Sequence, residues 1–279
     1  MKLGSNDISS VYLGTNGVSK VYLGSTEVWS AVDPDAQAFF DRVTTAGGTL
    51  SATEQTAINT LVFQMKADGI WSKMKAVYPM VGASAAACAQ NLKSSSFTGT
   101  FNGGWTFASS GATPNGTSGY MDTNLNDNTS LNLNDVHFSV YLRTNVDGLR
   151  ADLGVFNNST SGVNIYSRYL NNQYTRLHAE DTNTVSTTDS RGFRLGVRNT
   201  STSKSVFINN TKTAFTENSV SKVNGNIYLG CLNLVPGGPA NYSNRENAFA
   251  SIGDGLLDSE ASDFYTAVQA FQTTLSRNV

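Results

Sequence analysis

Short segments in which apolar and polar residues alternate fill most of the chain from residue 81 to residue 279. The clearest lies at 136–143, where the apolar positions are Val136, Phe138, Val140 and Leu142. Side chains point alternately to the two faces of a strand, so this pattern predicts a strand with one apolar face. Similar segments recur at 163–170, 174–179, 193–197, 205–208 and 226–229, separated by turns rich in Asn, Gly, Ser and Thr. Strands at this density predict an all-β sandwich.

Two helices are predicted ahead of this region. Asp33 can cap the first helix, because its side chain accepts a hydrogen bond from a free backbone N–H, and the Pro that follows loses no needed bond. The stretch Ser51-Ala52-Thr53-Glu54 is a capping box that begins the second helix, and Gly69 ends it. Both helices carry an apolar stripe at helical spacing, so they are predicted to pack on the sandwich.

A short third segment of the connector and a final helix complete the predicted elements. The third segment contains Ile70, Trp71, Met74 and Val77 and ends before a proline. The final helix carries Phe264, Tyr265, Val268 and Phe271 on one side. The predicted organisation is a repeat at 1–30, a helical connector at 31–80 and a β-sandwich at 81–279.

The first thirty residues form a repeat with a period of ten. A Leu-Gly-Ser or Leu-Gly-Thr phrase begins at residues 3, 13 and 23, and the first two copies end in Val-Tyr. Each copy is too small to bury its own apolar face, so copies must pack on neighbours or on other chains. Two interpretations stay open: a small meander on the main domain, or an assembly element that pairs with another subunit. In the second, the contacts would come from Val11, Tyr12, Val21, Tyr22 and Trp29.

Composition narrows the possible partners. The chain has 19 Lys and Arg against 21 Asp and Glu, and 14% of its residues are charged. This balance argues against nucleic acid or an anionic membrane as a main partner, since both require a basic surface. We expect a soluble protein made in a cytoplasm, because no signal peptide and no membrane-spanning apolar run is visible. Cys88 and Cys231 could pair, but two buried free thiols are favoured.

Three motifs together resemble tailed-bacteriophage virion proteins. They are the repeat, the phrase Lys66-Ala67-Asp68-Gly69-Ile70-Trp71, and the segment Phe249–Leu256 followed by the final helix. In such proteins a two-helix unit precedes a concanavalin A-like (laminin-G-like) lectin domain. The resemblance implies a concanavalin A-like antiparallel β-sandwich, a jelly roll, at 81–279. It also implies a fibre, appendage or capsid-decoration subunit of the virion, assembled in the host cytoplasm as a homotrimer that contacts other virion proteins through the repeat.

The sequence offers no catalytic constellation. Glycoside hydrolases need two carboxylates that flank the scissile bond, and no Glu-x-Asp-x-x-Glu strand occurs. The acidic cluster at 258–263 begins the final helix, where acids favour the positive end of the helix dipole. His137 and His178 have no Cys or His at ligand spacing, so we expect them to be strand residues. We therefore expect neither enzyme activity nor a metal centre.

Calcium is the one cofactor that the sequence raises as an alternative. Residues 122–127 alternate oxygen-bearing side chains, but Asp127 stands where an EF-hand needs Gly and Leu133 where it needs Glu. An EF-hand is excluded. A simpler carboxylate-and-carbonyl calcium site stays open, and a polar turn between strands is preferred.

The best candidate surface is a predicted hairpin of 163–170 and 173–179, turning at Asn171-Asn172. In that register one face carries Tyr169, Tyr174, Arg176 and His178, with Ser167 and Ile165, and the other carries Tyr166, Leu170, Leu177 and Ala179. Tyrosine, arginine and histidine could stack on and hydrogen-bond a sugar, or form a subunit contact. Ordinary amphipathic packing is the third interpretation, and a slip of one residue would exchange the faces.

These observations favour a virion protein that displays a lectin-like sandwich for adhesion to host-surface glycans, with weak sites multiplied by copy number. Two alternatives remain: a glycan-degrading enzyme on the same sandwich, and a structural spacer with no ligand. The position on head or tail, the host and the sugar are left open by the sequence.

Overall fold

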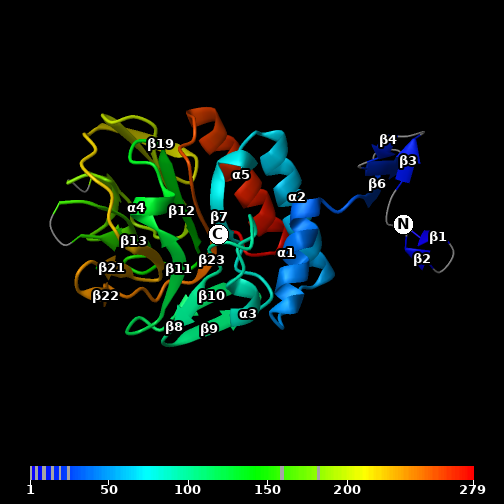
Figure 1. Ribbon diagram of the computed structural model, residues 1–279, viewed down its shortest axis with the longest axis horizontal. Helices are drawn as coiled ribbons and strands as arrows, with labels where there is room; N and C mark the ends of the chain where they lie inside the picture. The colour runs from blue at the N-terminus through cyan, green and yellow to red at the C-terminus, as the bar shows by residue number, and fades with distance from the viewer. Residues whose placement is uncertain are drawn as a thin grey trace.

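The structure, a computed structural model, describes residues 2–3, 6–7, 11–13, 16–18, 20–23, 26–157, 160–180 and 183–279. Its main body is a sandwich of two largely antiparallel β-sheets, with helices packed on one side (Figure 1). The predicted fold class, a mainly β, concanavalin A-like antiparallel sandwich with a C-terminal helix, is therefore confirmed.

The first sheet has eight strands and includes the segment that shows the clearest alternation. In spatial order its strands are β19 (Thr211–Thr216), β18 (Ser203–Ile208), β17 (Gly192–Arg198), β12 (Val136–Leu142), β23 (Asn247–Gly253), β10 (Gly111–Pro114) and β9 (Trp105–Ala108), with β7 (Met74–Tyr78) also paired to β23. All pairs in this sheet are antiparallel.

The second sheet has nine strands and carries the predicted hairpin. Its order is β16 (Asn183–Ser186), β15 (Asn172–Leu177), β14 (Gly162–Tyr169), β13 (Leu153–Phe156), β20 (Asn226–Leu229), β11 (Tyr120–Asn126) and β8 (Thr100–Asn102). Two short strands branch from it: β21 (Leu232–Leu234) runs parallel to β13, and β22 (Gly238–Ala240) pairs with β21. We call the β21–β22 pair, residues 232–240, the flap.

The main core lies between the two sheets. Val136, Phe138, Val140 and Leu142 of β12 all point into it, as the alternation predicts. The nine-stranded sheet contributes Ile165, Leu177 and Leu229 to the same cluster. Burying side chains of this size stabilises the fold by about 1.5–3 kcal/mol each.

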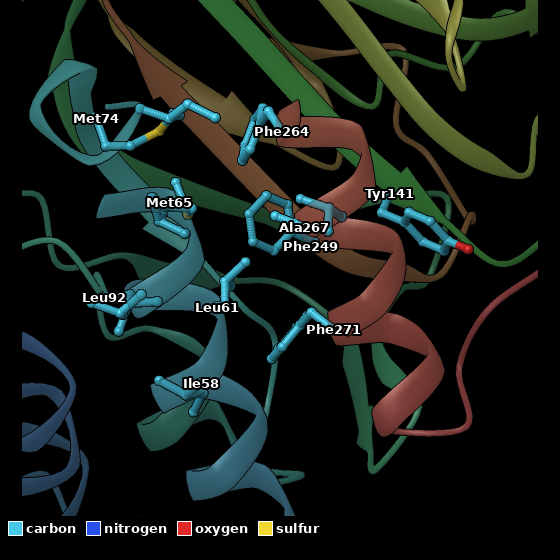
Figure 2. Close-up of a cluster of buried hydrophobic side chains, with 14 of the residues drawn as sticks. Ile58, Leu61, Met65, Met74, Leu92, Tyr141, Phe249, Phe264, Ala267 and Phe271 are labelled. Carbon is cyan, nitrogen blue, oxygen red and sulfur yellow. The ribbon is translucent and has the colours of Figure 1, made fainter. Parts of the chain in front are cut away.

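A second core lies on the other side of the eight-stranded sheet, beneath α1 (Pro34–Thr45), α2 (Ala52–Ala67) and α5 (Asp258–Thr274). Figure 2 shows Phe264 and Phe271 of α5 beside Phe249 of β23, with Leu61 and Met65 of α2 beside them. The face of β12 that alternates with the apolar one is therefore also buried. None of the described helices is long and apolar enough to span a membrane.

The predicted helix ends are confirmed. The Asp33 side chain accepts from the Asp35 N–H at 2.9 Å, at the start of α1. Ser51 and Glu54 form the complete capping box of α2. Asp258 and Glu260 lie in the first turn of α5, where the helix dipole favours acids. Two short helices, α3 (Ala85–Cys88) and α4 (Asp127–Ser130), lie between strands.

The third segment of the connector differs from the prediction. Only Trp71–Lys73 is helical, as the 3₁₀ turn η1, and Met74–Tyr78 is strand β7. Strand β7 pairs with β23, so the sheet begins before residue 81. The reason is that Ala76 and Tyr78 face the main core while Met74 and Val77 face the second core, a division that the apolar spacing of a short segment cannot reveal.

The described residues of the repeat form two-stranded hairpins. The pairs are β1 (Lys2–Leu3) with β2 (Asn6–Asp7), β3 (Val11–Leu13) with β4 (Asn16–Val18), and β5 (Lys20–Leu23) with β6 (Thr26–Ser30). Each pair brackets one Gly-Ser or Gly-Thr position, so the period of ten is the period of a hairpin. These strands lie beyond α1 from the sandwich (Figure 1).

The two cysteines are free and buried, as favoured from the sequence. Burial raises the pKa of the Cys88 thiol and of the Cys231 thiol to about 12. Both are therefore protonated and unreactive at neutral pH, since the thiolate is the reactive form.

Candidate ligand-binding site

A cavity of about 390 Å³ opens on the outer face of the nine-stranded sheet. We call it the tyrosine pocket. Its lining residues come from β13, β14, β15, the flap and the loops beside them: Leu149, Phe156, Asn164, Tyr166, Tyr169, Tyr174, Arg176, Leu232, Leu234 and Asn241. Its volume lies within the range of about 300–1,000 Å³ that is typical of small-molecule sites.

A β-bulge brings the three tyrosines together. Tyr166 lies opposite Tyr174 in the β14–β15 pairing, and the register shifts between Tyr166 and Tyr169. In a regular strand, residues three apart face opposite sides. The extra residue of a bulge changes this alternation, so Tyr166 and Tyr169 both line the pocket. The Tyr169 and Tyr174 rings lie 5.7 Å apart at 45°.

The tip of this hairpin is held from one side. Leu170 and Asn171 both have positive φ, at 49° and 56°, a conformation that costs energy for residues other than Gly. The Asp147 carboxylate accepts from both backbone N–H groups, at 2.9 Å and 3.2 Å. The Arg168 side chain also donates to Asn171 Oδ1 at 2.7 Å. These bonds fix the tip and hence the position of Tyr169.

A buried ion pair supports the pocket from beneath. Arg245 Nη1 donates to Asp152 Oδ1 at 3.0 Å, and both side chains are fully buried. Arg245 Nη2 donates to the Arg168 carbonyl at 2.6 Å, and Asp152 Oδ2 accepts from the Ser167 N–H at 2.9 Å. A buried pair whose remaining atoms are bonded in this way keeps its geometry, so β14 is anchored just before the hairpin tip.

The flap forms one wall of the pocket, and it can lie this close to the sheet because residue 154 is glycine. A Cβ on Gly154 would lie 2.8 Å from Leu232 Cδ1 and 2.7 Å from the Val163 carbonyl. Only glycine allows Leu232 so close to the sheet. Leu232 and Tyr166 form, with Ala151, a small apolar cluster separate from both cores, and Phe156 and Leu234 pack against it.

Polar groups lie at the floor of the pocket. The Tyr166 hydroxyl accepts from Asn241 Nδ2 at 2.9 Å. Burial raises the pKa of Tyr166, although the bond from Asn241 opposes this, so the hydroxyl keeps its proton. Asn164 is 5% exposed, and its Oδ1 has no hydrogen-bond partner among the described residues. The Arg176 guanidinium lies 4.4 Å from the centroid of the Phe156 ring, at cation–π distance.

Three of the four residues predicted for a glycan or subunit contact lie in this pocket, and one does not. Tyr169, Tyr174 and Arg176 line it. His178 is fully buried elsewhere, with Nδ1 2.9 Å from the Leu133 carbonyl and Nε2 2.7 Å from Asp127 Oδ1. The predicted exposure of His178 is therefore wrong, because β15 ends at Leu177 and the chain turns inward at positive φ.

The register of the hairpin also differs from the prediction. The turn residues are Leu170 and Asn171, one position earlier than expected. The bulge between Tyr166 and Tyr169 shifts the pairing further, so Arg176 pairs with Asn164, and Ser167 is fully buried. Tyr166 belongs to the pocket face, and Leu170, predicted to be buried, is 64% exposed at the tip.

The sequence analysis missed the other seven residues that line the pocket, and three of these carry polar groups: Asn164, Tyr166 and Asn241. Asn164 has a local signal, because an amide beside apolar strand residues must find a partner or face an open site. Asn241 has no local signal, because it lies 75 residues after Tyr166 in the chain and reaches the site only when the flap folds against the sheet.

The segment raised for calcium does not form the expected polar turn. Residues 120–126 are strand β11, and Asp127 begins α4. The Asp127 carboxylate accepts from the Val223 N–H at 2.6 Å and lies against His178. Within the described ranges, no three His, Cys, Asp or Glu side chains are grouped so that they could hold a metal ion.

A second cavity, of about 420 Å³, lies beside the start of α2. Glu54, the carboxylate among its described lining residues, already accepts hydrogen bonds from the backbone. Oε1 accepts from the Gly82 N–H at 2.8 Å, and Oε2 accepts from the Ser51 N–H at 2.8 Å. The Glu54 carboxylate therefore has a structural role. The tyrosine pocket is the stronger candidate for a ligand site because it combines aromatic rings with polar groups.

The side chains that line the tyrosine pocket are of kinds that can contact a ligand. Among the described residues that line it, none is a carboxylate. Glycoside hydrolysis needs an acid and a second carboxylate on either side of the bond. The pocket instead offers aromatic rings, amides and one guanidinium, which stack on a ligand and form hydrogen bonds with it.

The five residues predicted for assembly lie on the hairpins of the repeat. Val11 and Tyr12 are in β3, Val21 and Tyr22 in β5, and Trp29 in β6. Val21 and Trp29 are cross-strand partners.

No protein-family model matches the chain, and no curated protein matches it in sequence. Domain 4 of AbnA, a GH43 extracellular arabinanase from Geobacillus stearothermophilus, solved in complex with arabinotriose, is similar in structure. It is 14% identical, with a TM-score of 0.47, and the match covers 69% of this chain and 98% of that domain.

Two toxin domains are similar to the same degree. The binding domain of Paraclostridial Mosquitocidal Protein 1 is 12% identical, with a TM-score of 0.48 over 70% of this chain. The botulinum neurotoxin serotype D binding domain is 11% identical, with a TM-score of 0.49 over 71% of this chain. The match spans 52% of each of those domains. These similarities concern the sandwich and carry no inference about the pocket.

Proposed function

We propose that this protein is a non-catalytic, lectin-like binding module that holds a saccharide in the tyrosine pocket. The observation that carries the proposal is the pocket itself: three tyrosines, two amides and one arginine converge on a cavity whose described lining includes no carboxylate. Aromatic rings stack on the C–H faces of a sugar, and their hydroxyls hydrogen-bond its oxygens. Tyr169, Tyr174 and Arg176 retain the role considered for them from the sequence.

The repeat complements this site as a mounting element. Three small hairpins can bury little apolar surface by themselves, which favours contact with another chain. The resemblance to bacteriophage virion proteins supports a fibre or decoration subunit, assembled in the host cytoplasm as a homotrimer. In that arrangement several weak pockets would act together, and avidity would exceed the affinity of a single pocket. Host-surface glycans would be the ligands.

The test is binding of the full-length chain to an immobilised panel of glycans, with Tyr174→Ala beside it. We expect saccharide binding that is weakened about tenfold in the variant, the equivalent of about 1.4 kcal/mol. Tyr228→Ala is the matched control, because Tyr228 is also half-buried on the nine-stranded sheet but lies outside the pocket. An absence of saccharide binding, or equal binding by both variants, would contradict the proposal.

A further inference from the structure

We propose that the tyrosine pocket selects acetamido sugars, in which one hydroxyl of a hexose is replaced by an N-acetyl group. This inference rests on the proposed function and names the class of saccharide. An acetamido group has a methyl, an N–H donor and a C=O acceptor within a few atoms of one another. The pocket places an apolar wall beside an unfilled acceptor and a phenolic donor.

The apolar wall is formed by Leu232 and Leu234 of the flap and by Phe156 of β13. Leu232 is 4% exposed and packs on Tyr166 rather than on either core. A sugar hydroxyl placed against this wall would give up water without gaining a partner, which is unfavourable. A methyl group placed there would be removed from water at a gain.

The polar floor matches the amide of the same group. Because Tyr166 accepts from Asn241, its own proton is left to donate, and no described residue accepts it. Asn164 Oδ1 is buried and accepts no hydrogen bond from a described residue. A ligand N–H would satisfy Asn164, and a ligand C=O would accept from Tyr166. Rotation about the Cβ–Cγ bond of Asn164 exchanges its oxygen and nitrogen, so the amide suits either orientation of the ligand.

Charge separates an acetylated sugar from a free amino sugar. Among the described residues that line the pocket, none is a carboxylate. A protonated amine would find no negative charge on these residues to offset the cost of leaving water, whereas the neutral amide carries a much smaller cost. The expected order of affinity is therefore acetamido sugar, then neutral hexose, then amino sugar.

The test compares sugars that differ only at one carbon. N-acetylglucosamine, N-acetylgalactosamine and N-acetylmannosamine are each displayed at equal density on one polymer, beside the matching hexose and hexosamine. Binding to the full-length chain is measured at about pH 6, where the amine is protonated. We expect at least one acetamido sugar to bind about tenfold more tightly than its hexose, and the hexosamine to bind most weakly.

Two variants locate the preference. Tyr166→Phe removes the phenolic donor, so the ratio of acetamido sugar to hexose should fall to about threefold or less. Tyr228→Phe removes a hydroxyl of the same sheet outside the pocket and should keep the ratio. Because the readout is a ratio, a general loosening of the pocket does not mimic the effect. Equal binding of hexose and acetamido sugar would overturn the inference and leave the proposed function intact. An absence of binding to every sugar would overturn both.

Discussion

The two outer faces of the sandwich are built from strands with the same kind of alternation. Helices cover one face, and the tyrosine pocket opens on the other. On the eight-stranded sheet, α5 and α2 cover the outer face, and Tyr141, Phe249 and Phe264 are buried there (Figure 2). On the nine-stranded sheet, the short flap covers part of the face, and the tyrosine pocket opens beside it. The first face is part of a hydrophobic core, whereas the second carries a cavity.

Polar residues show the same contrast. His137 on the covered face has both ring nitrogens occupied, Nδ1 at 2.6 Å from the Asp254 carbonyl and Nε2 at 3.1 Å from Ser251 Oγ. Asn164 on the open face has an oxygen with no partner among the described residues. A satisfied polar group is part of the fold, and an unsatisfied one beside a cavity indicates a ligand.

The largest expected effect follows from breaking the covered face. Phe264→Ala removes a fully buried ring that lies 5.4 Å from Phe193 and 6.0 Å from Phe249. We expect a loss of about 3–5 kcal/mol in the free energy of unfolding. Urea unfolding measures it, with Tyr174→Ala as the comparison, which should cost about 1 kcal/mol or less because Tyr174 is only half-buried. Equal losses would remove the distinction between the two faces.

The next effect is a pH dependence that belongs to the covered face. Burial lowers the pKa of His137 to about 4, although the Asp254 carbonyl opposes this. The unfolded chain binds the same proton near pH 6.5. Between these values only the unfolded state is protonated, so stability falls as the pH drops from about 6.5 to about 4, by at most about 3.4 kcal/mol.

This pH dependence is measured by urea unfolding of the wild type and of His137→Gln at neutral pH and near pH 4.5. Glutamine is uncharged throughout, so the variant should lose less stability on acidification than the wild type does. The difference between the two proteins isolates His137 from the other groups that titrate in this range. An identical loss in both proteins would show that His137 is not held neutral by the fold.

The sequence predicts those parts of the structure that depend on neighbouring residues. The capping box at Ser51 and Glu54 is a local signal, and so is the alternation that begins at Val136. The helix–strand choice at Met74–Tyr78 is different, because this short segment has apolar residues on both sides and its partner β23 lies about 175 residues away. Only the assembled sheet decides it.

The candidate site was predictable in part for the same reason. Tyr169, Tyr174 and Arg176 belong to one hairpin, so a local pairing argument places them near one another. The bulge that adds Tyr166 has no sequence signal of its own, and the expected turn at Asn171-Asn172 forms one residue earlier because Asp147 binds the tip. Asn241 and the flap arrive through long-range contacts that no local pattern encodes.

The smallest expected effect on stability comes from removing the repeat, which belongs to neither of the two faces. A chain that begins at residue 31 lacks the repeat but keeps the segment that joins it to α2. The Asp33 N–H donates to Asn59 Oδ1 at 2.7 Å, Asn59 Nδ2 donates to the Ala31 carbonyl at 2.9 Å, and Lys66 Nζ lies 2.6 Å from Asp33 Oδ1. Because both cores lie within the residues that remain, the melting temperature should change by less than about 2 °C.

Removal of the repeat should change how the chain associates with other chains, although it leaves the stability nearly unchanged. If the repeat mounts the chain on a partner or on further copies of itself, the shortened chain will bind a single sugar as the full chain does. Sedimentation should then show a smaller oligomer than the full chain forms, and the shortened chain should no longer be incorporated into particles. Multivalent glycan surfaces will then hold it more weakly, since avidity depends on copy number. A shortened chain that still assembles would place the subunit contacts on the sandwich, and one that unfolds would show that the hairpins belong to the core.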